Sequence, residues 1–403
     1  MSLDTGRVHL LFMIDVARVI SGGTERHLYS LVKHLDPQRF VCGVVAFDLG
    51  AEYAEALQRL NVPVWSVPLP RIYGLNATRQ IFRLRRIIRS RKIHIVQTYH
   101  AKADTYGVVA AKLAGAKRTI SSRRDTGDRK PPAYRRLSRI TNRLFDRFIT
   151  VCDAVGRRVK ETENVAREKQ QTIHNGLDLE LFDAGSVSDS DLSRLRGELG
   201  LAAGDFVVGM VANFRPEKSF DVFLDAVRRA RASIPNLKAL AIGHGPTLPG
   251  CEELVARWGL RDVVAFPGRL NDVRTHVALM DVACLTPSSN EGFSNAILEK
   301  MAMEKPLVVT DIGGNAEAVA DGVNGFVVPP NDSERIGTAI VELHRHPAKR
   351  REMGRESRKR VERLFTMDRM IQAHERLYEE IMETSGTGWW QPRSRANRLK
   401  GRT

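Results

Sequence analysis

The stretch VHLLFMIDVARVISGGTERHLYSLVKHLDPQRFVCGVVAF, residues 8–47, decides the fold class. An apolar run at 8–16 predicts a strand, the segment 24–35 predicts a helix, and a second apolar run at 41–47 predicts another strand. A strand, a crossover helix and a further strand are the unit from which parallel sheets are built. The stretch therefore predicts an α/β fold.

The same alternation continues to about residue 175. Further helices are predicted at 51–60, 77–92 and 103–114, and further strands at 93–99, 118–124 and 146–152. We expect the strand at 146–152 to be the last of this domain. Repetition of the unit predicts a doubly wound parallel sheet with helices on both faces.

A segment rich in Gly, Ser and Asp, residues 176–205, predicts an interdomain linker. A second alternating series follows, with strands predicted at 206–214, 237–243 and 263–268 and a helix at 219–234. Two Rossmann-like domains, 1–175 and 206–365, suit a chain of 403 residues. Such domains face each other across a cleft and bind a ligand there, at the carboxyl ends of their strands. The basic tail 384–403, which contains two Trp residues, has no predicted structure.

The composition, with 42% hydrophobic and 27% charged residues, is typical of a globular protein. The chain contains no run of 18 apolar residues, so no membrane-spanning helix is predicted. The N-terminus lacks the pattern of a signal peptide. The expected compartment is therefore the cytoplasm. The four Cys residues are far apart and form no CxxC pair, so they predict neither a zinc site nor a disulfide framework.

The net charge of +16 comes from one region. Between Arg79 and Arg147 there are 20 Lys and Arg residues and four acidic ones, whereas the rest of the chain has 43 of each. A localised basic region indicates an anionic partner, such as phospholipid headgroups, a phosphorylated acceptor or nucleic acid, or else only solvated helix faces.

The most specific functional signal is the segment EGFSNAILE, in which Glu291 and Glu299 stand eight positions apart. If Ser294 or Asn295 caps the following helix, Glu291 lies in the loop before it and Glu299 lies inside it. Free backbone N–H groups then open between the two carboxylates and favour an anion. Eight residues at helical rise span at most about 12 Å, which is roughly the length of a diphosphate with a sugar at each end.

Further candidates follow the predicted strands. Gly22 and Gly23 open the first helix, where backbone N–H groups can approach a phosphate. Arg215 and Lys218 place two cations where they can neutralise a departing diphosphate. His100 follows the strand at 93–99 and can hydrogen-bond a sugar hydroxyl or the reacting centre. Backbone groups of three residues after another strand can read the edge of a nucleobase: Gly268, Arg269 and Leu270.

Other polar residues are weaker candidates. His174 and Asn175 are expected to stabilise a turn, and Glu317 is a possible ligand contact. Asp189 and Asp191 form a DxD triplet, which can bind a metal with a sugar nucleotide, but they fall in the predicted linker. We therefore predict no metal site and no cofactor.

Taken together, the motifs resemble glycosyltransferase family 4, whose members are retaining enzymes of the GT-B fold. The resemblance covers the chain to about Met382 and rests on SGGTERH, HAKA, HNGLDLELF, FRPEKSF, GHGP, PGRLNDV, the segment from Glu291 to Glu299, and GGNAEAVADGVNGFVVPP. The order and spacing of these motifs carry it, since several of them are weak singly. It implies a metal-independent hexosyltransferase that uses a nucleotide-diphosphate sugar.

The resemblance implies roles for the matching residues. Glu291 would contact the donor sugar, and Glu299 the ribose. His100 matches the active-site His near the donor sugar. The diphosphate would be held by Gly23, Arg215, Lys218 and the loop Gly292, Phe293, Ser294 and Asn295. Glu291 would either bind the sugar or act as a nucleophile.

The resemblance also implies that the acceptor binds the first domain and that a final helix, 366–383, crosses back to it. The basic region 79–147 would then face an anionic membrane or a lipid-linked acceptor, which suggests a peripheral membrane enzyme of surface polysaccharide or glycolipid synthesis. A UDP-sugar is the favoured donor. The alternatives are an epimerase or hydrolase of nucleotide sugars with the same fold, and a basic nucleic-acid-binding protein, although the chain lacks a recognisable RNA-binding motif.

Overall fold

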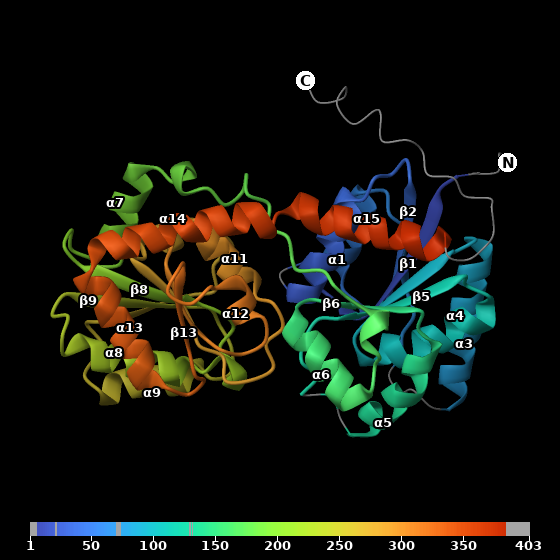
Figure 1. Ribbon diagram of the computed structural model, residues 1–403, viewed down its shortest axis with the longest axis horizontal. Coiled ribbons are helices and arrows are strands. Elements are labelled where there is room, and N and C mark those ends of the chain that lie inside the picture. The colour runs from blue at the N-terminus through green and yellow to red at the C-terminus, as the bar shows by residue number, and fades with distance from the viewer. Residues whose placement is uncertain (1–5, 21, 70–73, 129, 131, 384–403) are drawn as a thin grey trace.

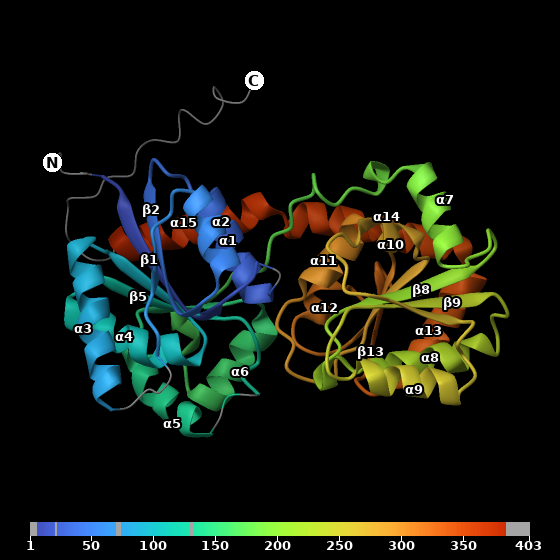
Figure 2. The ribbon, with the colours of Figure 1, turned by 180° about the vertical axis from the view of Figure 1, so that it is seen from behind.

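The computed structural model describes residues 6–20, 22–69, 74–128, 130 and 132–383, so the tail 384–403 lies outside the described residues. Two domains lie side by side (Figure 1). Each contains a parallel sheet with helices on both faces, which is clearest when both views of the ribbon are compared (Figures 1 and 2). This arrangement confirms the predicted fold class.

The first sheet has seven parallel strands in the order β3-β2-β1-β4-β5-β6-β7. Its central strands are buried along most of their length. The strands are β1 (Val8–Ala17), β2 (Phe40–Leu49), β3 (Val64–Ser66), β4 (Ile95–Tyr99), β5 (Arg118–Arg123), β6 (Arg147–Thr150) and β7 (Gln170–Thr172). The helices are α1 (Gly23–His34), α2 (Ala51–Arg59), α3 (Leu75–Ser90), the π-helical turn η1 (Ala103–Gly107), α4 (Val108–Ala114), α5 (Pro132–Thr141) and α6 (Asp153–Glu163).

The last strand of this sheet is β7, so the prediction that the strand at 146–152 ends the domain was wrong. β7 pairs in parallel with β6, and Gln170 lies opposite Phe148. Its three residues, QQT, are polar and half-buried. Such a short edge strand needs no apolar run, and therefore no hydrophobic pattern marked it.

The second sheet has six parallel strands in the order β10-β9-β8-β11-β12-β13. The strands are β8 (Phe206–Val211), β9 (Leu237–Ile242), β10 (Val264–Gly268), β11 (Val282–Leu285), β12 (Leu307–Thr310) and β13 (Gly325–Val328). The helices are α8 (Phe220–Arg231), α9 (Leu248–Arg257), α10 (Arg274–Leu279), α11 (Asn295–Ala302), α12 (Asn315–Ala318), α13 (Ser333–Arg345) and α14 (Pro347–Leu364).

Strand order reverses once in each sheet, between β1 and β4 in the first and between β8 and β11 in the second. At such a switch point the chain leaves the two neighbouring strands in opposite directions, and a crevice opens beyond their carboxyl ends. The loops that follow these four strands are therefore the ones the fold places for ligand binding.

The segment 176–205, predicted to be an interdomain linker, contributes a helix to the second domain. It contains α7 (Asp189–Glu198), whose N-cap Ser188 accepts a hydrogen bond from the Asp191 N–H. Leu195 is buried in the core of the second domain. Asp189 and Asp191 thus lie in the first turn of a helix, where carboxylates are favourable. No group of three or more metal-ligating side chains is found among the residues that the structure describes.

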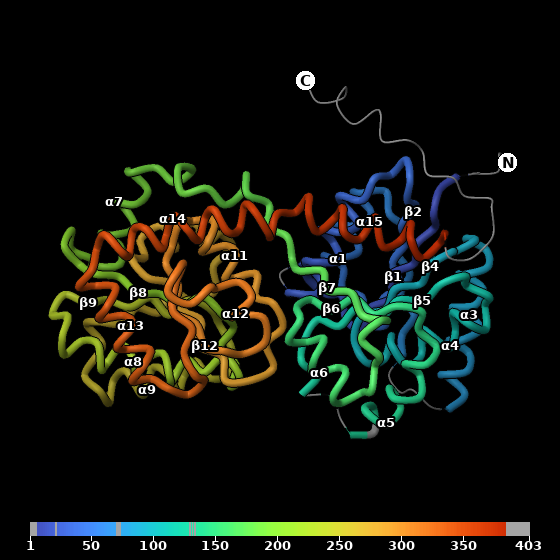
Figure 3. The backbone as a smooth tube through the Cα atoms, in the orientation of Figure 1, coloured from blue at the N-terminus to red at the C-terminus, as the bar shows by residue number. Residues whose placement is uncertain are grey.

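The chain crosses between the domains twice. After α14 on the second domain, α15 (Met367–Glu383) runs along the first domain, as the tube trace shows (Figure 3). Ile371, Leu377 and Tyr378 are buried in the core of the first domain. The Tyr378 hydroxyl donates to Gln97 of β4 at 2.7 Å. The first domain is therefore built from both ends of the described chain. None of the described helices is long and apolar enough to cross a membrane.

Direct contacts join the domains beyond the carboxyl ends of their strands. The Glu317 carboxylate is 2.8 Å from Nε2 of His174 and accepts the backbone N–H groups of Asp153 and Ala154 at the start of α6. Burial alone would raise the pKa of Glu317, but these hydrogen bonds outweigh it and hold the pKa below its usual value. Glu317 thus joins the domains in this structure.

A second set of contacts between the domains involves the loop from Gly292 to Phe293. Asn175 Nδ2 donates to the Phe293 carbonyl at 2.7 Å. A Cβ atom added at Gly292 would lie 2.0 Å from the backbone oxygen of Arg124 in the first domain, so a larger residue would force the domains apart. His174 and Asn175, expected to stabilise a turn, instead bridge the two domains.

Burial of His374 on α15 predicts how stability depends on pH. Burial, aided by the nearby charge of Arg124, lowers the pKa of His374 to about 4, whereas an unfolded His titrates near 6.5. Between these values the unfolded chain binds more protons, so stability rises with pH across this window. We expect a fall from pH 7 to pH 4 to cost about 3 kcal/mol through this residue.

Urea unfolding at several pH values measures this effect. His374→Phe should show a shallower loss of stability between pH 6.5 and 4 than the wild type. His34→Gln, which changes an exposed His of α1, is the matched control and should keep the wild-type slope. Equal slopes for the wild type and His374→Phe would contradict the assignment.

Candidate active site

The two signature carboxylates lie as their spacing predicts. Glu291 is in the loop after β11, and Glu299 is inside α11, which begins at Asn295 with Ser294 at the N-cap position. Both residues are almost buried, with 9% and 6% of their surface exposed. The Ser294 side chain makes no capping bond. The N–H groups at the start of a helix lack the usual partners one turn back, which favours an anion there; in α11 the Ile297 N–H donates to the Ser294 carbonyl at 3.2 Å.

Glu291 is paired with a cation of its own domain. Lys218 Nζ donates to the Glu291 carboxylate. Lys218 ends a 3-10 turn, η5 (Pro216–Lys218), which follows β8. Because β8 and β11 are neighbours at the switch point, their loops bring Lys218 and Glu291 together. Arg215 begins the same turn; its side chain is exposed and has no carboxylate partner among the described residues.

Glu299 is paired with a cation of the other domain. Arg26 Nη1 donates to Glu299 Oε1 at 2.7 Å. The Arg26 side chain is 39% exposed, whereas that of Glu299 is 8% exposed. No pattern in the sequence marked Arg26 as a site residue. Its only signal was its place in SGGTERH, three residues after Gly23, where nothing indicated which way its side chain points.

Gly22 and Gly23 lie at the start of α1, at the N-cap and first positions. A Cβ at Gly23 would meet no atom within 4 Å, and the φ of this residue is not left-handed. The turn itself therefore does not require Gly at 23, and the missing side chain leaves open space in front of the first turn of α1.

His100 faces the same turn. It follows β4 directly, and its Nε2 is 3.2 Å from Oγ1 of Thr24 in α1. Its φ of 71° is left-handed, which is costly for a residue with a side chain and often marks functional sites. The structure thus brings His100 to the Gly22–Gly23 turn.

Asp15, near the end of β1, is a further polar residue of the site that no sequence motif marked. It accepts the backbone N–H groups of Lys102 and Ala103 at 2.9 and 2.7 Å. Burial raises its pKa, although the charge of neighbouring His100 partly opposes this. The Lys102 ammonium donates to the Leu69 carbonyl at 3.1 Å. A lone Asp in an apolar strand gave no pattern from which to select it.

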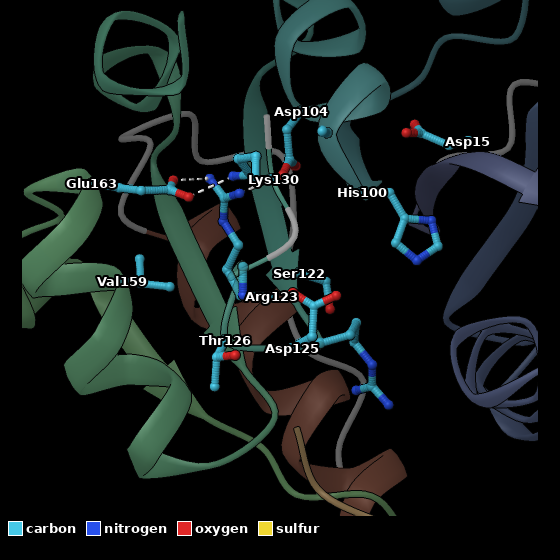
Figure 4. Close-up of a pocket in the computed structure, with 13 residues that line it drawn as sticks. Asp15, His100, Asp104, Ser122, Arg123, Asp125, Thr126, Lys130, Val159 and Glu163 are labelled. Carbon is cyan, nitrogen blue, oxygen red and sulfur yellow. Dashed lines mark hydrogen bonds and ion pairs between the residues drawn. The ribbon is translucent and has the colours of Figure 1, made fainter. Parts of the chain in front are cut away.

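A pocket of about 250 Å³ opens beside Asp15 and His100 in the first domain (Figure 4). A buried network lines its far side: Arg123 pairs with Asp104 at 2.7 Å and with Glu163 at 3.1 Å, and Lys130 also binds Glu163. Burial would raise the pKa of Glu163, but Arg123 and Lys130 lower it to about 2.

This pocket lies against the loop that carries Glu291. Thr126, which lines it, is 3.4 Å from Oδ1 of the adjacent Asn290. Arg124 also lines it, and its backbone oxygen packs on Gly292. The pocket of the first domain and the signature loop of the second domain are therefore neighbours across the junction.

The remaining candidates lie farther along the same edge or are covered. Gly268 ends β10, two strands from β8, and has a left-handed φ of 77°. Arg269 is exposed, and Leu270 packs partly against the core. The Phe293 side chain is buried against His174 and Phe365, so only its backbone can face a ligand. Residues 268–270 thus lie at the end of β10, two strands away from β8 and the turn that carries Lys218.

The charged groups around α11 favour one class of ligand. Lys218 pairs with Glu291 and Arg26 pairs with Glu299, giving two cations and two carboxylates around the loop and first turns of α11. The cations and free N–H groups favour phosphate oxygens, and the carboxylates favour hydroxyl donors. A ligand that carries both groups in one chain, a phosphate flanked by sugars, matches this set.

Comparisons with known proteins agree with the geometry. Residues 21–181 match the family described as Glycosyltransferase Family 4, and residues 205–346 match Glycosyl transferases group 1. The putative glycosyltransferase EpsD of Bacillus subtilis is 30% identical over 53% of this chain and 56% of its own length. The O-antigen chain mannosyltransferase C of Escherichia coli is 28% identical over 62% of this chain and 67% of its own length. The chain thus spans little more than half of several curated relatives that it matches.

Solved structures share the fold. HepE of Anabaena, determined in complex with UDP, is 23% identical and superimposes with a TM-score of 0.81 over 93% of this chain and all of that one. A glycosyltransferase of Rickettsia africae gives a TM-score of 0.84 at 18% identity, over 94% of this chain and all of that one. With two doubly wound domains, a paired-carboxylate loop at their junction and family matches in both halves, the chain belongs to glycosyltransferase family 4 and has the GT-B fold.

Proposed function

We propose that the protein is a retaining glycosyltransferase that moves a hexose-type sugar from a UDP-sugar to an acceptor hydroxyl, in surface polysaccharide or glycolipid synthesis. The observation that carries the proposal is the cluster of cations and carboxylates at the domain junction, Lys218 with Glu291 and Arg26 with Glu299. HepE was determined with UDP and with UDP-glucose, and one relative acts in O-antigen synthesis. These relatives support the choice of donor and pathway.

The donor would lie along the site from Glu299 to Glu291. The ribose hydroxyls would donate to Glu299, the diphosphate would lie over the start of α11 beside Arg215 and Lys218, and the sugar would reach Glu291. Binding of this kind exchanges the two ion pairs for ligand contacts, since Lys218 can move from Glu291 to the diphosphate. Gly268 to Leu270 would meet the nucleobase farther along the edge.

Transfer requires that the bond between the anomeric carbon and the diphosphate oxygen breaks while the acceptor oxygen bonds to the same carbon. In our proposal the acceptor approaches on the face from which the diphosphate leaves, so the configuration is retained, and its proton passes to the departing phosphate oxygen. Arg215 and Lys218, rather than a metal ion, would balance the charge that develops on the diphosphate. Glu291, released by Lys218, would bind the sugar.

The acceptor would enter the pocket of the first domain. Two of its cations, Arg123 and Lys130, are already balanced by Asp104 and Glu163. Hydroxyl groups suit such a surface because carboxylates accept from them and guanidinium groups donate to them. Asp15 and His100 lie at the side of the pocket and would hydrogen-bond the acceptor near the reacting centre.

One face of α3 would attach the enzyme to an anionic membrane. Leu75 and Phe82 are 92% and 60% exposed, and Arg79, Arg83 and Arg86 share their helical face. The helix contains no acidic residue. An exposed apolar and basic stripe fits a lipid surface, where each Lys or Arg near anionic headgroups contributes about 1 kcal/mol.

A thermal-shift screen of UDP, GDP and ADP and their sugars tests the donor. The preferred nucleotide, at a hundredfold excess over its Kd, should stabilise the wild type by about 2.7 kcal/mol. Glu299→Gln should remove most of this shift, because it lacks the charge that holds the ribose. Glu304→Gln, which changes an exposed residue just after α11, should retain it. An undiminished shift in Glu299→Gln would refute the ribose assignment.

Gly23→Ala tests the phosphate approach. Since the added methyl meets no protein atom, the Tm should stay the same or rise slightly. The methyl would stand where the diphosphate approaches, so the Kd for the donor should rise about tenfold, a loss of about 1.4 kcal/mol. Gly197→Ala in α7, whose methyl also meets no atom, is the control. Calorimetric titration would decide, and an unchanged Kd in Gly23→Ala would speak against this contact.

Liposome cosedimentation tests the membrane surface. Binding should increase with the fraction of anionic lipid, fall with salt, and drop strongly in the double variant Arg83→Glu/Arg86→Glu and in Phe82→Ser. The double variant Arg345→Glu/Arg351→Glu makes the same charge change on exposed residues of the second domain and should bind like the wild type. Binding that depends on neither anionic lipid nor salt would exclude this face of α3 as a membrane-binding surface.

A further inference from the structure

We propose that Arg26 is a donor-binding residue supplied by the first domain, which leaves Glu299 for the diphosphate when the nucleotide sugar binds. The inference rests on the proposed function, since it assumes that Glu299 receives the ribose. It adds a third cation to the diphosphate site and places that cation on the opposite domain from Arg215 and Lys218.

The first observation is where Arg26 lies. It belongs to the first turn of α1, directly after the open space in front of Gly23, and its guanidinium is 2.7 Å from the Glu299 carboxylate. The side chain is partly exposed at the cleft, whereas the carboxylate that it binds is almost buried. Arg26 can therefore move without unpacking a core, but Glu299 cannot follow it.

The second observation is that the ion pair occupies the position assigned to the ribose. Hydroxyl groups that donate to Glu299 compete with Arg26 for the same oxygen atoms. The diphosphate is joined to the ribose through its 5′ carbon, so an Arg that reaches the carboxylate beside the ribose needs only a change of side-chain rotamer to reach the phosphate. The planar guanidinium fork matches phosphate oxygens as well as it matches a carboxylate.

After the exchange each of the two charged groups still has a hydrogen-bonding partner. Arg26 passes from one anion to another, while Glu299 exchanges a guanidinium for hydroxyl donors. Because Arg26 and Glu299 belong to different domains, the ion pair joins the domains before the donor binds, and the contact from Arg26 to the diphosphate joins them afterwards. A nucleoside without phosphate would offer hydroxyls to Glu299 but nothing to Arg26, and so would break this tie.

The difference between a nucleoside and its diphosphate makes the proposal testable. Calorimetric titration would give the Kd of UDP and of uridine for the wild type, Arg26→Gln, Arg26→Lys and Lys33→Gln. Arg26→Gln should weaken UDP binding at least about tenfold and leave uridine binding unchanged or tighter. Arg26→Lys should restore part of the UDP affinity. Lys33→Gln removes an exposed charge two turns further along α1 and should leave the Kd of both ligands unchanged.

A second comparison separates direct contact from an effect through Glu299. In a Glu299→Gln background, Arg26→Gln should still weaken UDP binding, because its partner there is the phosphate. A ratio of UDP to uridine affinity that stays the same in Arg26→Gln, or UDP binding that becomes tighter, would show that Arg26 only blocks the empty site and would overturn the proposal. A wild type that binds no nucleoside diphosphate at all would instead overturn the proposed function.

Discussion

Each of the two nearly buried carboxylates in the cleft touches a cation in this structure. Removing a carboxylate from water without a partner is strongly unfavourable, and the usual response is protonation. Lys218 and Arg26 supply the compensating charges, one from each domain. The rest of the site follows from this constraint: the loops that carry the charges must meet, which requires adjacent strands at the switch points, and the two domains must stay in contact.

The contacts around the site hold the two domains together and leave little space for larger side chains. His174, Asn175 and Glu317 hydrogen-bond across the junction, and the backbone of Gly292 packs directly on the chain of the first domain. At the same time the ion pair between Arg26 and Glu299 can be exchanged for ligand contacts. The junction thus combines fixed contacts behind the site with a replaceable one inside it, and this arrangement suits a donor that must enter and leave between the domains.

Much of the fold and part of the site could be read from the sequence. Apolar runs marked the long buried strands, and the spacing of Glu291 and Glu299 placed one in a loop and one in α11. Periodicity failed where burial is weak, as in the polar edge strand β7. It also could not show partners across the junction: Arg26, Asp15 and Glu317 are ordinary residues along the chain, and only the arrangement of the two domains reveals what their side chains contact.

The return of α15 to the first domain has a consequence for how the chain matures. During synthesis the strands from β1 to β7 leave the ribosome long before residues 367–383 do, so the surface that receives Ile371, Leu377 and Tyr378 stays uncovered while the whole second domain is made. Exposed apolar surface of this kind attracts chaperones and promotes misassembly. The nascent N-terminal half therefore depends on a segment that is translated after the second domain, and a polypeptide truncated before residue 367 would carry an unfinished hydrophobic core.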